Sequence, residues 1–311
     1  MILLILVEGS DCVGKSTLVQ QLAEHVAKLH PTDQVDVWHA GPPTKHPLDE
    51  YVTPLLDYRP LRGRHIICDR WHLGEAIYPG IFLRPTRFDL AVQAYTELFL
   101  RSRGAVLVHV DAEDADVEDC LNARGDELVQ SSQASVILQE FRTRAAASLL
   151  PTLVVQGLQD TRYDVESIVR RATTLDYVSR DLGRFTTYVG SRIPAVLLLG
   201  DVRHGHLRGD ATDLRPAFMP YGATSGHYLL SQIIDKYGYR SLASVGIANA
   251  CDDDDHETLW TLLRKPRTVA LGRKAQKRTP WANVKVAHPQ FTRRFKHSAG
   301  DDYAREIFGD F

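Results

Sequence analysis

Gly9-Ser10-Asp11-Cys12-Val13-Gly14-Lys15-Ser16 is the stretch that decides the fold of this chain. It fits the pattern G-x-x-x-x-G-K-S and stands between an apolar run, Met1–Val7, and a helical pattern that runs from residue 15 to about residue 29. A strand before the glycines and a helix after them are the context that a phosphate-binding loop requires. A glycine turn with a helix cap is the alternative, and the Lys-Ser pair in its expected place argues against it.

The side chains of this loop suit a nucleoside triphosphate. Backbone N–H groups and the helix N-terminus would surround the phosphates. Lys15 would reach the β and γ oxygens, and the Ser16 hydroxyl would ligate Mg²⁺. We therefore predict ATP and Mg²⁺ as cofactors and Gly9 through Thr17 as the nucleotide-binding segment.

Composition is that of an ordinary folded protein with more than one domain. The chain has 311 residues, 44% hydrophobic and 24% charged, and its formal net charge is −2. This length favours two domains. The four scattered cysteines form no C-x-x-C pair, which is typical of free thiols in a reducing cytoplasm. The apolar N-terminal run is too short to span a membrane and lacks a basic flank, so neither a signal peptide nor a membrane partner is expected.

The first part of the chain alternates between strand and helix patterns, which predicts an α/β domain whose parallel sheet is flanked by helices. We assign this domain to residues 1–178. Strands are expected at 1–7, 35–39, 64–68, 105–110 and 153–155, and helices at 15–29, 88–101, 112–123, 132–149 and 164–174.

A linker is expected at 179–193, where glycines interrupt any periodicity. The alternation then resumes and predicts a second α/β domain over 194–311. Its strands are expected at 195–199, 244–248, 268–271 and 284–287, with a helix at 225–237. The first domain is net acidic and the second net basic, which suggests that they have different partners.

Asp69 and Arg70 follow the strand at 64–68, and ligands bind at the carboxyl ends of strands in open α/β sheets. Asp69 could hold Mg²⁺ or orient an acceptor, and Arg70 could bind an acceptor phosphate with two hydrogen bonds. A salt bridge at the strand end is the alternative for this pair.

Glu75 bears on the kind of acceptor. Phosphoryl transfer to an alcohol gains about 10²- to 10⁴-fold from a carboxylate that accepts the proton, whereas a phosphate acceptor needs no base. Glu75 and Asp69 are the candidates for this base, and an ion pair with Arg84 or another neighbour is the alternative for Glu75. The predicted catalytic residues are therefore Lys15, Asp69, Arg70 and Glu75, with Ser16 and Asp69 at the metal.

Two of these segments together resemble thymidylate kinases. Val7–Thr17 is similar to the opening of that family, and Asp69-Arg70-Trp71-His72-Leu73-Gly74-Glu75, with Tyr78 and Arg84, is similar to its Asp-Arg-aromatic segment. Viral thymidylate-kinase-like proteins are the nearest in pattern, and the likeness covers about residues 1–175. It implies a P-loop kinase fold in which Asp69 and Arg70 address metal and acceptor. It also implies that Trp71 or Phe88 lines the base pocket, and that Arg84 belongs to the substrate site.

The same resemblance implies a mobile lid. Arg124, just before Gly125-Asp126-Glu127, falls where such kinases carry one, and Arg142 or Arg144 is a second candidate. Surface arginines on ordinary helices are the alternative for all three.

An ordered set of patches over 194–311 resembles the uracil-DNA glycosylase superfamily. It consists of Leu197–Asp201, Pro216–Leu230, Gly246–Asn249, Thr268–Ala275 and His288–Gln290. The likeness implies that Asp201 takes the position of the catalytic acid, that Phe218 stacks on an extruded base and that Asn249 reads its edge. His288 would open a loop that enters DNA. The usual Glu-Ala-Pro-Gly is replaced by Asp201-Val202-Arg203-His204-Gly205, which argues against retained glycosylase activity.

Charge also indicates a polymeric partner for this part of the chain. Residues 264–297 hold eleven Lys and Arg and no Asp or Glu, with Trp281, Phe291 and Phe295 interleaved. Basic side chains neutralise phosphates while aromatic ones stack on bases, so DNA is the predicted partner, with Arg273 and Lys274 in the contact. A solvated basic face is the alternative. The acidic run Asp252–Asp255 is interpreted as a solvated loop rather than a metal site.

Three functions remain open from the sequence. The first is a kinase that phosphorylates the hydroxyl of 5-hydroxymethyluracil in DNA, whose base the second domain would extrude. It resembles the hydroxymethyluridine DNA kinases of bacteriophages, and it would act in the cytoplasm of an infected bacterium. The second is a free deoxynucleotide kinase of the dTMP type with an appended DNA-binding or repair domain. The third is a DNA-binding protein with an ATPase switch, which the Asp69-Arg70 pair argues against.

Overall fold

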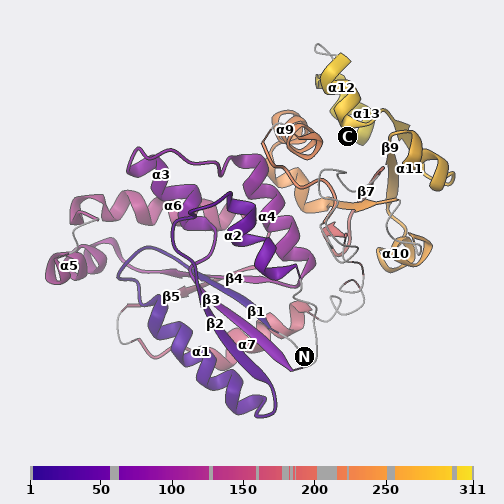
Figure 1. Ribbon diagram of the computed structural model, residues 1–311. Helices are drawn as coiled ribbons and strands as arrows, with labels where there is room; N and C mark the ends of the chain where they lie inside the picture. Colours follow the sequence, from indigo (N-terminus) through magenta and orange to yellow (C-terminus); the bar gives the residue numbers. More distant parts are fainter. Residues whose placement is uncertain are drawn as a thin grey trace. The chain divides into compact units, whose positions relative to one another are not determined.

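The computed structural model describes residues 3–56, 63–125, 129–158, 161–176, 182, 185, 187–201, 216–222, 224–250, 256–295 and 300–309. The chain separates into two compact units, which are described one at a time (Figure 1). Unit 1 comprises Met1–Lys45, Pro60–Phe88 and Gly104–Tyr177, and unit 2 comprises His46–Arg59, Asp89–Arg103 and Val178–Phe311. Among the described residues, no helix has the length and apolar character needed to cross a membrane.

Unit 1 is built on a five-stranded parallel sheet in the order β2-β3-β1-β4-β5. The central strand β1 is entirely buried because helices cover both faces of the sheet, which is why its sequence is continuously apolar up to its last residue. The alternation of strands and helices that the sequence predicts is confirmed. The strands are β1 (Leu4–Glu8), β2 (Gln34–His39), β3 (Arg64–Asp69), β4 (Val106–Asp111) and β5 (Thr152–Gln156).

Helices flank this sheet (Figure 1). On α1 the buried residues Leu18, Leu22 and Val26 recur every four positions, so one stripe of the helix packs against the sheet. One helix, α3, was not expected from the sequence. The helices of unit 1 are α1 (Lys15–Leu29), α3 (Leu73–Ile81), α5 (Asp114–Arg124), α6 (Ala134–Ala147) and α7 (Val165–Asp176), with a short 3₁₀ turn at Ser131–Gln133.

Unit 2 is a second α/β unit around a sheet in the order β10-β9-β7-β8-β6. The four longer strands run parallel, and β6 pairs antiparallel with β8 at one edge. The strands are β6 (Val189–Gly190), β7 (Val196–Gly200), β8 (Val245–Asn249), β9 (Arg267–Leu271) and β10 (Val284–Val286). The helices are α2 (Pro47–Tyr51), α4 (Leu90–Ser102), α9 (Ser225–Tyr237), α10 (His256–Leu262), α11 (Arg273–Arg278), α12 (Pro289–Phe295) and α13 (Gly300–Phe308), with 3₁₀ turns at Thr53–Leu55 and Tyr239–Ser244.

The units differ from the predicted domain boundaries at two helices, α2 and α4, and at the 3₁₀ turn Thr53–Leu55. Helix α4 lies within the span predicted for the first domain, yet its contacts assign it to unit 2. The buried Tyr95 hydroxyl donates to the carbonyl of Ala217 at 2.7 Å, and Arg101 donates to the carbonyl of Ala243 at 2.9 Å. These bonds join positions more than 120 residues apart, and local periodicity carries no signal for them.

The predicted linker at 179–193 also contributes to unit 2 in its described part. Val189 and Gly190 form β6 opposite Ile247 and Gly246. The side chain of Tyr188 is fully buried there, and its hydroxyl donates to the carbonyl of Ser191. The end of this segment is therefore core structure rather than a spacer.

Candidate functional site

The phosphate loop connects β1 to α1 and depends on its two glycines. Gly14 has φ +87°, and a Cβ added there would lie 2.3 Å from the carbonyl oxygen of Leu158. A Cβ at Gly9 would lie 2.4 Å from the carbonyl oxygen of Val110. Any larger residue would collide with backbone at both positions, so the loop can pack closely against the neighbouring strand ends only with glycine.

Lys15 is buried inside this loop. Its ammonium donates to the carbonyl of Ser10 and lies 3.9 Å from the carboxylate of Asp11. Burial lowers the pKa of Lys15 to about 8, and the nearby Asp11 opposes part of that shift. A buried ammonium enclosed by backbone is poised to exchange these contacts for phosphate oxygens.

Ser16 and Asp69 meet at the carboxyl end of β3, as a shared metal site requires. The Ser16 hydroxyl donates to Asp69 Oδ2 at 3.1 Å, and His39 Nδ1 lies 3.6 Å from the same oxygen. The other oxygen of Asp69, Oδ1, is buried and has no hydrogen-bond partner among the described residues. A hydroxyl beside a carboxylate with an unsatisfied oxygen is a donor set that fits Mg²⁺.

Arg70 is held against the loop by Asp11. Its guanidinium pairs with Asp11 Oδ1, and the Tyr78 hydroxyl donates to Asp11 Oδ2 at 3.3 Å. Arg70 has φ +65°, a left-handed conformation that a side chain other than glycine rarely adopts. The Asp69-Arg70 turn thereby aims the carboxylate and the guanidinium at the same loop. The role of Asp11 as the link between Arg70 and α3 could not be predicted from spacing.

Glu8 is a buried carboxylate that the sequence reasoning missed. Its Oε1 accepts the N–H of Trp71 at 3.0 Å and of Leu73 at 2.9 Å, and burial raises its pKa. A charged residue at the end of an otherwise apolar strand is the sequence feature that could have identified Glu8. Glu8 fixes the start of α3, which carries Glu75 and Tyr78. Trp71, predicted to line a base pocket, is itself largely buried and lies 6.0 Å from Trp38 between ring centroids.

Glu75 forms the ion pair that the sequence left open as its alternative role. Both of its oxygens accept from the Arg84 guanidinium, and Thr86 donates to Oε1 at 2.5 Å. The Glu75 carboxylate is almost completely buried. Its oxygens are thus already occupied by Arg84 and Thr86.

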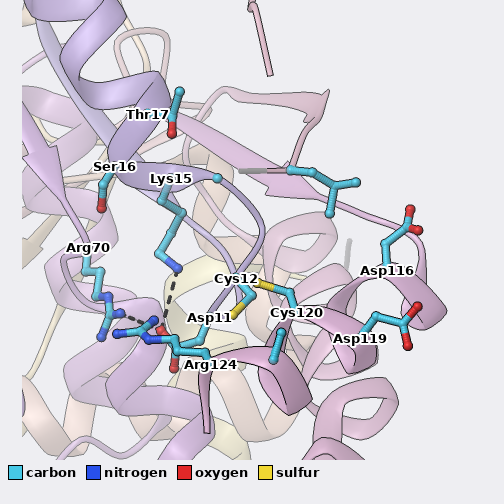
Figure 2. A pocket seen from close by; sticks show the side chains of 13 residues that line it. Asp11, Cys12, Lys15, Ser16, Thr17, Arg70, Asp116, Asp119, Cys120 and Arg124 are labelled. Atoms are coloured by element: carbon cyan, nitrogen blue, oxygen red, sulfur yellow. Dashed lines mark hydrogen bonds and ion pairs between the residues drawn. The ribbon is translucent and has the colours of Figure 1, made fainter. Parts of the chain in front are cut away.

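A cavity of about 840 Å³ opens beside the phosphate loop (Figure 2). Its cationic groups, Lys15, Arg70 and Arg124, come from three separate elements and gather around Asp11, as Figure 2 shows. Three carboxylates line the same cavity, so a polyphosphate would be held by Lys15 and Arg70 in exchange for their contacts with Asp11. The remaining lining residues are Cys12, Gly14, Ser16, Thr17, Asp116, Asp119, Cys120, Ala123 and Leu158.

Helix α5 forms one wall of this cavity, and the sequence assigns only its last residue, Arg124, to the site. Cys120 lies beside Cys12 of the loop, and burial together with this thiol contact raises the pKa of Cys12 to about 11. Arg124, one of the lid candidates, ends α5 at the cavity, while residues 126–127 lie outside the described part of the chain.

The other lid candidates are engaged elsewhere. Arg142 bonds both oxygens of Asp111 at 2.9 and 3.0 Å and also contacts Asp114, so it anchors α6 to the end of β4. Arg144 lies 3.8 Å from Glu140 one turn earlier on the same helix.

In unit 2 the predicted residues gather around Gly200 at the carboxyl ends of the strands. A Cβ at Gly200 would lie 2.2 Å from the ring of Phe218 and 3.1 Å from Asn249 Oδ1. Phe218 and His288 stack at 5.9 Å between ring centroids. Both Phe218 and Asn249 are buried, and Phe218 has φ +56°. These residues therefore form one cluster; their predicted role in binding a base stays a prediction.

Asp201 follows Gly200 but is already engaged. Its Oδ1 accepts the N–H of Ala275 in α11 at 2.6 Å. Arg273 and Lys274 are exposed in the same helix. The acidic run 252–255 and the replacement segment 202–205 lie outside the described residues.

Comparisons with known proteins leave the family open. No family model matches this chain, and no curated protein matches it significantly. Among solved structures, the YorR protein of Bacillus subtilis, crystallised in complex with phosphorylated GDP, is similar at 19% identity and a TM-score of 0.38. The match covers 57% of this chain and 98% of that one, and a likeness at this level carries no functional argument.

The sheet order and the phosphate loop define unit 1 as an α/β unit of the P-loop, nucleotide-kinase-like fold.

Proposed function

We propose that this chain is an ATP-dependent phosphotransferase with a thymidine-type acceptor, namely the hydroxyl of 5-hydroxymethyluracil in DNA that unit 2 binds. The observation that carries the phosphotransferase assignment is the Ser16–Asp69 contact beside a buried loop lysine. This arrangement supplies a metal position and a phosphate position at one loop. The DNA assignment is supported by the cluster around Gly200 and by the basic composition of residues 264–297.

In this proposal each residue of unit 1 has a defined task. Amides of the loop and Lys15 hold the β and γ phosphates, and Ser16 and Asp69 hold Mg²⁺, which neutralises developing charge when it is bound. Arg70, which pairs with Asp11 of the loop, would bind the acceptor. The acceptor oxygen forms a bond to the γ phosphorus while the bond from that phosphorus to the bridging oxygen of ADP breaks.

The proton of the acceptor hydroxyl must go to a base. Glu75 already holds Arg84 and Thr86, whereas Asp69 has a carboxylate oxygen without a partner among the described residues. Of the two candidates we assign this task to Asp69, through Oδ1, which leaves Oδ2 beside the Ser16 hydroxyl for the metal.

The engagement of Glu75 favours a second candidate, transfer to a free deoxynucleotide such as dTMP. A phosphate acceptor is already anionic and needs no base. In that case unit 2 would serve as a separate DNA-binding or repair module.

One labelling experiment distinguishes these functions. The full chain and Lys15→Ala are incubated with Mg²⁺ and ATP labelled in the γ phosphate, together with dTMP, plain duplex DNA or duplex DNA that contains 5-hydroxymethyluracil. Label in modified DNA alone, absent with Lys15→Ala, is the expected result. Label in dTDP alone would establish the free-nucleotide kinase instead. Loss of ATP without transfer would indicate a DNA-binding ATPase.

A further inference from the structure

A cluster of metal-binding side chains lies at the edge of the unit 1 sheet opposite the phosphate loop. His30 follows the end of α1, Asp33 precedes β2 and His65 is the second residue of β3. One ligand atom from each of the three lies within 4.8 Å of the other two. Because β2 and β3 begin here in register, with Gln34 opposite Arg64, the backbone itself brings the three residues together.

The backbone and the hydroxyl of Thr32 orient the carboxylate of Asp33. The N–H of Asp33 donates to the carbonyl of His30 at 3.0 Å, which closes a tight turn. Thr32 donates to Asp33 Oδ1 at 3.3 Å. The other oxygen, Oδ2, is left facing the two rings, at 3.1 Å from His65 Nε2 and 3.9 Å from His30 Nδ1.

We propose that His30, Asp33 and His65 bind a Zn²⁺ ion, with water in the fourth position. Zinc ligands about 2.0–2.2 Å from a tetrahedral ion lie about 3.4 Å from one another. The separations of 3.1 and 3.9 Å bracket that value, so small side-chain rotations would complete the site. Two imidazoles and one carboxylate suit Zn²⁺, whereas Mg²⁺ prefers oxygen ligands alone.

The surroundings of His65 agree with this assignment. Its ring is fully buried, and its Nε2 faces Asp33 Oδ2 at 3.1 Å. His30 stacks on it at 4.7 Å between centroids, and both His30 and Asp33 are partly open to solvent, which gives an ion a route in.

Cobalt substitution tests the site without reference to phosphotransfer. The full chain, stripped of metal with a chelator, is titrated with Co²⁺ in excess Mg²⁺, and the visible absorption of tetrahedral Co²⁺ is recorded before displacement by Zn²⁺. We expect one equivalent to bind. His30→Ala and Asp33→Asn should each weaken binding by at least about tenfold. The matched control is Asp36→Asn, which removes a carboxylate that pairs with Arg64 at the same sheet edge and should leave the affinity unchanged.

Several results would overturn the proposal. They are the absence of the visible band in the unsubstituted chain, or a band that persists at full affinity in both His30→Ala and Asp33→Asn. An intense near-ultraviolet band from sulfur ligation would instead place the ion at Cys12 and Cys120. His30 and Asp33 are partly exposed, so these two variants are expected to fold; melting curves recorded without metal would check this.

Discussion

At the scale of the residue, Lys15 should couple the proposed binding of a nucleotide to pH. Its pKa of about 8 in the folded chain lies below the ordinary 10.5 because the ammonium is buried. A bound polyphosphate favours the charged form and would raise that pKa again. Above about pH 8 the free protein must therefore take up a proton in order to bind, and affinity should fall by up to about tenfold per pH unit.

Titration calorimetry with a nucleoside triphosphate at about pH 7 and about pH 9, in two buffers of different ionisation enthalpy, measures this uptake. We expect little proton uptake at the lower pH and close to one proton at the higher. Equal uptake at both would refute the assignment. The same pKa shift also affects the stability of the fold. Between about pH 8 and 10.5 the unfolded chain binds more protons at this lysine than the folded chain does, so the free energy of unfolding increases as pH rises.

A second prediction at this scale concerns Glu75 and Arg84. Arg84→Met would leave a buried carboxylate without its partner and should cost about 3 kcal/mol of unfolding free energy in urea. The double variant Glu75→Gln, Arg84→Met removes both charges and should recover part of that loss. Equal stability of the single and double variants would show that the loss of Arg84 does not leave the buried carboxylate destabilising.

The same pair allows a kinetic test. If Glu75 only supports the fold, Glu75→Gln should lower transfer to the modified DNA less than tenfold, whereas Asp69→Asn should lower it by about 10²-fold or more. A loss of about 10²-fold or more in Glu75→Gln would return the base role to Glu75.

At the scale of the element, the sequence identifies strands better than it identifies short helices. The apolar run that becomes β1 predicts a buried strand by itself. Helix α3 gives no such local signal, since Gly74, Pro79 and Gly80 all disfavour a helix. A distant group, the Glu8 carboxylate that accepts the N–H of Leu73, stabilises its start instead. The site shows the same contrast between local and distant signals. The parallel topology predicts that Ser16 and Asp69 meet, but it does not predict the pairing of Asp11 with Arg70.

The start of α4 offers a test at this scale. Asp89 caps the helix because its Oδ1 accepts the N–H groups of Ala91 and Val92, each at 3.0 Å. Asp89→Ala should cost about 1 kcal/mol in the unfolding of unit 2. Asp89→Asn keeps the acceptor and removes only the carboxylate charge beside His227, whose Nε2 lies 2.7 Å from Asp89 Oδ2, so it should cost less. Equal losses in the two variants would assign the effect to the contact with His227 rather than to the cap.

At the scale of the whole molecule, the two units have different electrostatic tasks in the proposed function. Unit 1 concentrates cations in one cavity around a loop, as a small polyphosphate requires. The second part of the sequence distributes basic residues along a long stretch, as a polymer of phosphates requires. In the sequence, the distribution of charged residues is the feature that predicts different partners for the two parts of the chain. The cluster around Gly200 depends on the strand order of unit 2, and the alternation of strands and helices does not specify that order.

The exposed basic residues of α11 provide the test of this division. Each phosphate contact made by a cation releases counterions, so affinity for DNA falls with salt in proportion to the number of contacts. Arg273→Glu with Lys274→Glu should weaken binding of the full chain to duplex DNA and reduce the slope of log affinity against log salt by about 2. Lys28→Glu, on an exposed position of α1, is the matched control and should change neither quantity.

ATP binding should be unaltered in both variants, because the loop cavity lies in unit 1. An unchanged salt slope in the double variant would remove α11 from the DNA contact, and an equal effect of Lys28→Glu would mean that only total charge matters.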